Sequence, residues 1–404
     1  MNAPRTSGGE SPQEKLTALD AVRGGAAVVV FTGHYFRNFA PEFEKSLNGT
    51  ILYALLNGPA AVILFFVLSG FVLSRRPILA GRVSGIVIAA IKRWPRLAGP
   101  VIVSSFFYIF GALSGAFPRP GQLMPGEGIP LPIIYWGFGR HAENIPAVLR
   151  ESAFKTFFVG SAKFNDVLWS MHWEFVGSFL ALAMAFVICL RLPSKFQFVI
   201  LALIAIAATA HHPYLSCFAT GMIFCLVHEK FGRGRSMANG RAILLSLLAV
   251  ALFSYNAIEP AGPWSWCAKL PAETQLLLWV GLQTIAALCA LSVALYNPNL
   301  RSLLSGHVGC LLGRMSFPIY LLHLFVLCSF TAWVCIIADA RVPPFWLVLI
   351  LYPATATVLF LVAYPLMKFD GWWVKTLNAA SQRGERAFVS RWRSPALVAD
   401  QAIR

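Results

Sequence analysis

Long apolar runs separated by short polar segments restrict this chain to a membrane protein. A helix needs about 20 residues to cross the hydrocarbon core of a bilayer, and several runs reach that length. Only 12% of the 404 residues are charged, whereas soluble proteins average about 25%. We therefore predict an all-α integral membrane protein with about ten transmembrane helices, some of them tilted or incomplete. The runs cover roughly residues 18–38, 58–75, 95–116, 167–190, 196–210, 214–229, 242–257, 275–296, 317–337 and 345–366.

The distribution of lysine and arginine predicts which helix ends face the cytoplasm. With the N-terminus inside, 22 of the 33 basic residues fall in inner segments and 9 in outer segments. Because cytoplasmic loops are enriched in basic residues, both termini are predicted to be cytoplasmic. The same distribution explains the formal charge of +16 through topology, so we expect no nucleic-acid partner.

The chain divides into three parts on this topology. Residues 1–17 form a cytoplasmic segment, residues 18–366 the transmembrane domain, and residues 367–404 a basic cytoplasmic tail. Within the domain, residues 117–166 form a long outer loop, and loops of this length are often lids or binding loops. The tail is expected either to lie on the anionic inner leaflet or to be disordered.

The first apolar run contains an arginine and a histidine. Thr17 and Asp20 have the spacing of a capping box, which predicts a helix start near Ala18. Arg23 and His34 are 11 residues apart, so they share one helix face about 16 Å apart along the axis. Ionisable groups in hydrocarbon cost at least about 2.5 kcal/mol and often mark a functional path. The alternative is that Arg23 extends to the inner surface and His34 is a packing residue.

The fourth run opens with a polar stripe. Asp166, Ser170 and Glu174 follow one another in steps of four, which places them on one helix face. Glu174 and His34 are both expected in the outer half of the membrane. A carboxylate beside a histidine orients the imidazole for proton transfer. The alternative is that Asp166 caps the helix and Glu174 makes a structural hydrogen bond.

Basic residues gather in the first inner loop. Arg93 and Arg96, together with Arg75, form a cationic patch that faces the cytoplasm. Guanidinium groups bind phosphate in a bidentate manner, so the patch suits a phosphorylated ligand. Ordinary positive-inside anchoring remains the alternative.

A second polar stripe lies on the ninth run. Ser316, Tyr320 and His323 stand at positions i, i+4 and i+7, on one helix face. Ser316 is predicted to be the N-cap, with Pro318 in the first turn. The stripe either contacts substrate or packs with local hydrogen bonds.

Several chemistries lack their sequence signature. The eight cysteines contain no CxxC pair, and we interpret them as buried packing residues. His211 and His212 have no third ligand at a suitable spacing, so no metal site is predicted. The chain has no GxSxG motif, P-loop or dinucleotide fingerprint, which leaves a serine hydrolase or an ATP-driven pump unsupported.

Four stretches together resemble the membrane-bound acyltransferase-3 family. They are LDAVRGGAAVVVFTGHYF, FFVLSGFVLS followed by RWPR, LWSMHWE and MSFPIYLLH. Their order and the ten-span frame make the set specific. The residues that match the family's motifs are Arg23, His34, Arg93, Arg96, Trp169, Ser170, Glu174, Ser316, Tyr320 and His323.

The resemblance implies an enzyme that moves an acyl group, often acetyl, from cytoplasmic acyl-coenzyme A. The acceptor would be a hydroxyl of a carbohydrate or another envelope molecule at the outer side of a cell inner membrane. This chain is similar to the stand-alone form, without a fused hydrolase-like domain. It departs from many members in carrying Glu174-Phe175 where they have two adjacent glutamates.

The resemblance also implies roles for individual residues. His34 would be the general base or a covalent acyl carrier, oriented by Glu174 or Asp166. The remaining carried-over residues, together with Arg75 from the cationic patch, divide between donor and substrate binding. Arg93, Arg96, Arg75 and Arg23 would serve the coenzyme, and Trp169, Ser170, Ser316, Tyr320 and His323 would contact substrate. A transporter or flippase that uses Arg23, His34 and Glu174 as a path without acyl chemistry is the alternative.

Overall fold

The computed structural model describes residues 12–81, 83–118, 144–190, 192–338 and 344–392, and every regular element within them is helical. The longer helices are α1 (Pro12–Phe39), α3 (Gly58–Ala80), α4 (Val83–Leu113), α8 (Trp169–Cys189), α9 (Ser194–His211), α10 (Pro213–Val227), α11 (Asn239–Phe253), α12 (Ala272–Tyr296), α14 (His307–Val326) and α16 (Phe345–Trp392). The short helices are α2 (Pro41–Leu47), α6 (Ile145–Arg150), α7 (Thr156–Phe158), α13 (Pro298–Leu304) and α15 (Ala332–Ile337). Turns of 3₁₀-helix cover Ile51–Leu55, Asp166–Leu168 and Gly262–Lys269, and π-helical turns cover Glu151–Lys155, His228–Gly232 and Leu327–Thr331.

Seven helical segments in the described part of the chain are long and apolar enough to cross a membrane. They are Gly58–Ala80, Val83–Leu113, Asp166–Cys189, Ser194–His211, Ala272–Tyr296, His307–Ile337 and Phe345–Arg383. The prediction of an all-α, multi-pass membrane protein is confirmed. Each of the ten predicted runs coincides with a helix, although α1, α10 and α11 are not among the seven. The number of crossings and the cytoplasmic termini stay predictions.

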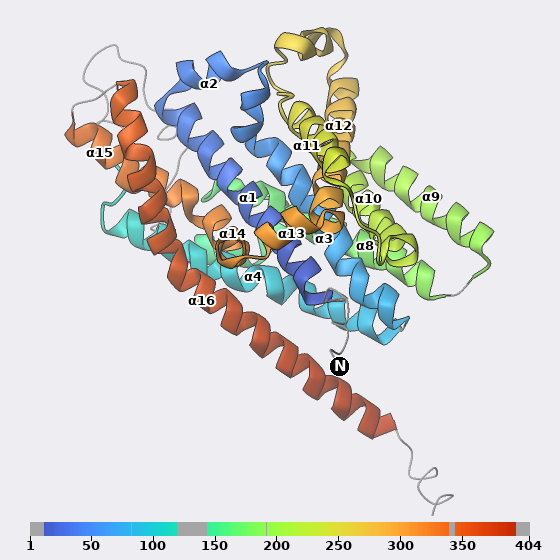
Figure 1. Ribbon diagram of the computed structural model, residues 1–404. Coiled ribbons are helices and arrows are strands. Elements are labelled where there is room, and N and C mark those ends of the chain that lie inside the picture. Colours follow the sequence, from blue (N-terminus) through green and yellow to red (C-terminus); the bar gives the residue numbers. More distant parts are fainter. Residues whose placement is uncertain (1–11, 82, 119–143, 191, 339–343, 393–404) are drawn as a thin grey trace, which may run out of the picture.

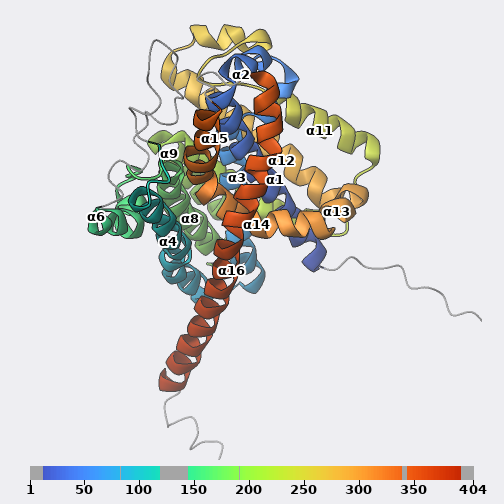
Figure 2. The same ribbon diagram turned by 90° about the vertical axis from the view of Figure 1, so that its left-hand side faces the viewer.

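The helices pack around α1 and α3 (Figure 1). Helix α1 contacts α14 and α3, and α3 in turn contacts α8 and α10. Helices α4 and α16 cross the outside of this group and touch both each other and α14. After a 90° turn, α16 is seen to project beyond the rest of the bundle as one continuous helix (Figure 2).

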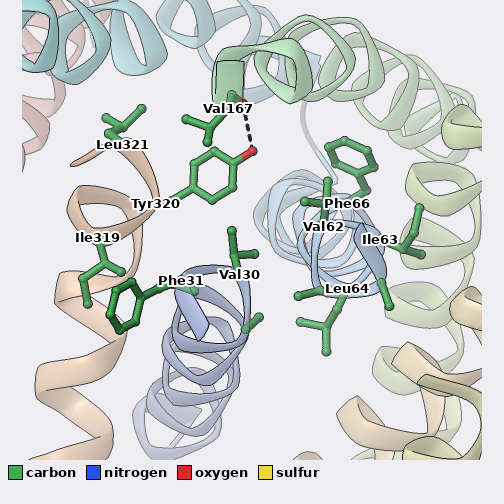
Figure 3. Close-up of a cluster of buried hydrophobic side chains, with 14 of the residues drawn as sticks. Val30, Phe31, Val62, Ile63, Leu64, Phe66, Val167, Ile319, Tyr320 and Leu321 are labelled. Carbon is green, nitrogen blue, oxygen red and sulfur yellow. Dashed lines mark hydrogen bonds between the residues drawn. The ribbon is translucent and has the colours of Figure 1, made fainter. Parts of the chain in front are cut away.

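The centre of the bundle is mostly apolar, and Tyr320 is one of the buried residues there (Figure 3). Val30 of α1 and Val62 of α3 face the ring of Tyr320 on α14. The Tyr320 hydroxyl donates a hydrogen bond to the carbonyl oxygen of Val167, 2.8 Å away. This bond joins the start of α8 to α14, and it satisfies a polar group that would be costly to bury alone.

Two glycines let α3 and α10 approach closely. A Cβ atom on Gly221 would collide with the backbone of Val67 and Phe71, and one on Gly70 would collide with the backbone of Phe218. Small residues of this kind allow close backbone contact between membrane helices.

We expect Gly221→Ala to destabilise the fold by about 1–3 kcal/mol, because backbone cannot move aside as a side chain can. Thermal melting of the purified protein measures the loss. Gly281→Ala is the matched control, since apart from its own helix no atom of the described residues lies within 4 Å of the added Cβ on α12. Equal melting temperatures for Gly221→Ala and the wild type would contradict the close packing.

Two element boundaries differ from the sequence prediction. Helix α1 already begins at Pro12, so Thr17 is not its cap. Helix α14 begins at His307, so the prediction that Ser316 is an N-cap is wrong. The helix continues through Pro318, whose ring nitrogen has no hydrogen to donate to the Arg314 carbonyl one turn earlier.

Two predicted loops are also partly helical. Arg93 and Arg96 lie within α4 rather than in an inner loop, since α3 and α4 are joined by a turn at Gly81. Of the outer loop, residues 119–143 lie outside the described residues, and 145–158 are helical. Helix α16 continues beyond residue 366 to Trp392, so the first part of the tail extends the last helix.

Candidate active site

A cavity of about 650 Å³ opens between α1, α3, α4, α8, α14 and α16. Its apolar wall comes mainly from α3, and polar side chains from the other helices face it. The charged lining is predominantly basic. The six basic residues are Arg23, Arg93, Arg96, Arg314, Lys368 and Lys375, and the two acidic ones are Glu174 and Asp370. The cavity is therefore suited to an anionic ligand that also carries an apolar part.

A buried ion pair joins Arg93 of α4 to Glu174 of α8. The Ser69 hydroxyl donates to the Glu174 carboxylate at 2.5 Å, and Arg93 Nε donates to the Ser178 hydroxyl at 2.5 Å. Only 11% and 14% of the Arg93 and Glu174 side chains are exposed, so each charge depends on the other. The pair holds α3, α4 and α8 together at the cavity wall.

Arg96 makes a second ion pair, one helical turn along α4. Its two terminal nitrogens bind the two carboxylate oxygens of Asp370 at 2.6 and 3.2 Å. The guanidinium also lies 5.9 Å from the ring centre of Phe317. The two parallel N–H groups of a guanidinium can donate to the two oxygens of a carboxylate or to two oxygens of a phosphate.

Arg23 connects α1 to α14 on the opposite wall. Its Nε donates to the Ser316 hydroxyl at 3.0 Å, and Nη2 donates to the Gly313 carbonyl at 3.4 Å. Asp20, one turn earlier, lies 3.1 Å from the same guanidinium. Arg23 and Ser316 were predicted on separate helices, and the structure brings them into contact.

Ser170 and Tyr320 line the deep end of the cavity, within the bundle. Their hydroxyl oxygens lie 2.6 Å apart, and both groups also bond to the Val167 carbonyl. Both side chains are buried. The two polar stripes predicted from the sequence therefore meet here, since Ser170 belongs to the first and Tyr320 to the second.

His34 and His323 form a pair beyond Tyr320. Their ring centres are 5.0 Å apart, and the His323 ring is 6.1 Å from that of Tyr320. His34 Nδ1 donates to the Val30 carbonyl at 2.9 Å, and His323 Nδ1 donates to the Tyr320 carbonyl at 2.8 Å. Because a carbonyl only accepts, both neutral rings carry their proton on Nδ1 and leave Nε2 as a lone pair. His323 Nε2 is buried and has no hydrogen-bond partner among the described residues.

Five predicted site residues do not line this cavity. His34 and His323 lie beyond its deep end. Among the described residues, neither Glu174 nor Asp166 forms a hydrogen bond with His34. Arg75 instead bonds the buried carboxylate of Glu229 at 2.7 Å. The remaining two are Trp169, whose ring packs against Tyr214 at 5.7 Å, and Asp166, in the 3₁₀ turn before α8.

Three contributors to the site were missed. Ser178 continues the four-residue steps of the first stripe, so extending the stripe by one step finds it. Ser69 lies in the stretch FFVLSGFVLS, where nothing in the local sequence indicates its hydrogen bond to Glu174. Asp370 lies in the segment assigned to the tail, and no local signal marks it as the partner of Arg96.

Comparison with known proteins gives one match. A family model described as an acyltransferase domain matches residues 16–364, which is most of the chain. No curated protein and no solved structure shows significant similarity. The match includes every predicted site residue, and it ends before the cavity-lining segment Met367–Lys375.

Proposed function

The chain belongs to the acyltransferase-3 family, and on that premise we propose that it transfers an acyl group, most simply acetyl, from acyl-coenzyme A to a hydroxyl group. The acceptor is a carbohydrate or another envelope-linked molecule. It is acylated at the outer side of a bacterial inner membrane, while the donor enters from the cytoplasm.

The charge of the cavity carries the proposal of a coenzyme A donor. Six basic side chains face a space that also has an apolar wall, which suits a ligand with phosphates at one end and an apolar arm at the other. Asp370 already occupies the guanidinium fork of Arg96 with two oxygens. A donor phosphate presents the same oxygen geometry, so it can replace this carboxylate. Arg93 is paired with Glu174, so its role is to stabilise the cavity wall rather than to bind a phosphate.

His34 is proposed as the general base. Its Nδ1 proton is held by the Val30 carbonyl, so Nε2 has a free lone pair for an acceptor hydroxyl. The hydroxyl proton moves to Nε2 while the acceptor oxygen forms a bond to the thioester carbonyl carbon. The carbon–sulfur bond then breaks, and the leaving thiolate takes that proton from Nε2, which returns His34 to its neutral form. His323 packs against the His34 ring and limits its orientation.

Mass spectrometry of cell-envelope glycans tests the function. Cells with the wild-type protein are expected to show an acyl mass shift that is missing without the protein and in His34→Ala. The matched control is His211→Ala, an exposed histidine at the end of α9, which is expected to keep the shift. If purified wild-type protein fails to consume acyl-coenzyme A and glycan masses do not change, the proposal is wrong.

A further inference from the structure

The cavity has one wall that the family match does not include. Met367, Lys368, Asp370, Gly371, Trp372 and Lys375 all line it, and all lie beyond residue 364. They belong to the middle of α16, the long helix that runs along the outside of the bundle (Figure 1). This wall is therefore a feature of this chain in addition to the family's matched region.

The segment is fixed to α4 by one of its faces. Trp373 Nε1 donates to the Pro95 carbonyl at 2.8 Å, and its ring stacks on Phe369. A Cβ on Gly99 would collide with the Trp373 indole, so this contact is close. Asp370 on the same side binds Arg96. The segment is thus held in place while its other face stays open.

The open face carries a lysine, a tryptophan and a second lysine. Lys368, Trp372 and Lys375 stand at positions i, i+4 and i+7, so they form one stripe along α16. All three side chains are exposed, and the Trp372 residue is 57% exposed although it lines a cavity. Arg314 faces the same space. Neither lysine nor Arg314 takes part in an ion pair within the described residues.

A flat aromatic ring between cations that make no ion pair in the described part of the chain matches the chemistry of a nucleotide, although Lys368 also lies 5.2 Å from the ring centre of Tyr364. The indole offers a stacking surface for a planar base, and the ammonium groups offer charge for its phosphates. Tryptophan and lysine also anchor helices at membrane surfaces. A surface anchor, however, has no reason to line a cavity that also contains Arg93, Arg96 and Glu174.

We infer that Lys368, Trp372 and Lys375 form a nucleotide subsite at the cavity mouth. Trp372 stacks on the base, and the two lysines with Arg314 bind the phosphates. The inference rests on the proposed function because it assigns the nucleotide half of the coenzyme A donor to this wall. The thioester arm then extends along α3 toward Ser170 and Tyr320.

Binding of adenosine 3′,5′-bisphosphate, the nucleotide half of coenzyme A, tests the subsite without any acyl transfer. Titration calorimetry with the purified full-length protein is expected to show binding. Trp372→Ala should weaken it about tenfold, and Trp372→Phe should restore most of the affinity, as base stacking predicts. Trp346→Ala is the matched control, since Trp346 is 62% exposed on the same helix away from the cavity, and it should bind like the wild type.

Two results would overturn the subsite: no binding to the wild type, or equal binding to Trp372→Ala. The second would leave membrane anchoring as the role of this tryptophan. Acyl transfer is measured separately with acetyl-coenzyme A and with acetyl-pantetheine, which lacks the nucleotide. If the protein turns over both donors, and its preference between them is the same in the wild type and in Trp372→Ala, the subsite is refuted and the proposed function is not. If the protein turns over neither donor but still binds the nucleotide, the proposed function is refuted and the subsite is not.

Discussion

His34→Ala is expected to lower acyl transfer about 10²–10⁴-fold, the usual contribution of a general base. The variant removes the Nε2 lone pair and keeps the helix, because alanine has the highest helix propensity. The lost side chain makes one backbone bond, to Val30 within α1, so little of the fold depends on it. The rate is measured as the release of free thiol from acetyl-coenzyme A, with equal amounts of folded protein in each assay.

His323→Ala separates the two histidines. His323 packs against His34, and its hydrogen bonds within the described residues are to its own helix, so we expect it to act by positioning. Its loss should reduce the rate less than the loss of His34 and change the pH profile of the remaining activity. If His34→Ala retained wild-type turnover, the base would have to be another group. If both variants lost activity equally with an unchanged pH profile, His323 would not be a positioning residue.

Arg93→Ala is expected to destabilise the fold by about 3–5 kcal/mol, because it leaves the Glu174 carboxylate buried without its countercharge. The effect should appear as a large drop in melting temperature in detergent. Glu174→Ala should do the same to Arg93, whose remaining partners are the hydroxyls of Ser69 and Ser178.

A double variant distinguishes lost charge balance from lost volume. Arg93→Met combined with Glu174→Leu removes both charges and keeps apolar bulk, so stability should return toward that of the wild type. The surface pair Lys45 and Glu42 provides the control, since both side chains are mostly exposed and Lys45→Ala should barely change melting. A double variant as unstable as Arg93→Ala would mean that the ion pair is not the source of the effect.

The positions of the helices could be predicted because hydrocarbon demands long apolar segments, and these are visible in the sequence. Helix ends were harder to place. The apolar run ends at residue 366, but α16 continues beyond it. A helix ends where capping or packing stops it, and not at the first charged residue. In α14 the proline suggested a first turn, whereas contacts with α1 keep the helix continuous around it.

The side-chain types of the site could be predicted, and several of their partners could not. Glu174 was expected beside His34, yet it binds Arg93, which lies 81 residues away in sequence. Periodicity shows which residues share a face of one helix, but not which face of another helix it meets. The meeting of Ser170 with Tyr320 and of His34 with His323 depends on the packing of three helices, which no single stripe encodes.

The length of α16 has a consequence for how a ligand arrives. Its 48 residues make a rod about 72 Å long, more than twice the roughly 30 Å of bilayer hydrocarbon. A large part of the rod must therefore stand in water or among lipid headgroups. Trp372 lies 27 residues from the start of this rod, about 40 Å along it. A polar molecule can therefore reach this stretch from the aqueous phase without crossing the bilayer hydrocarbon.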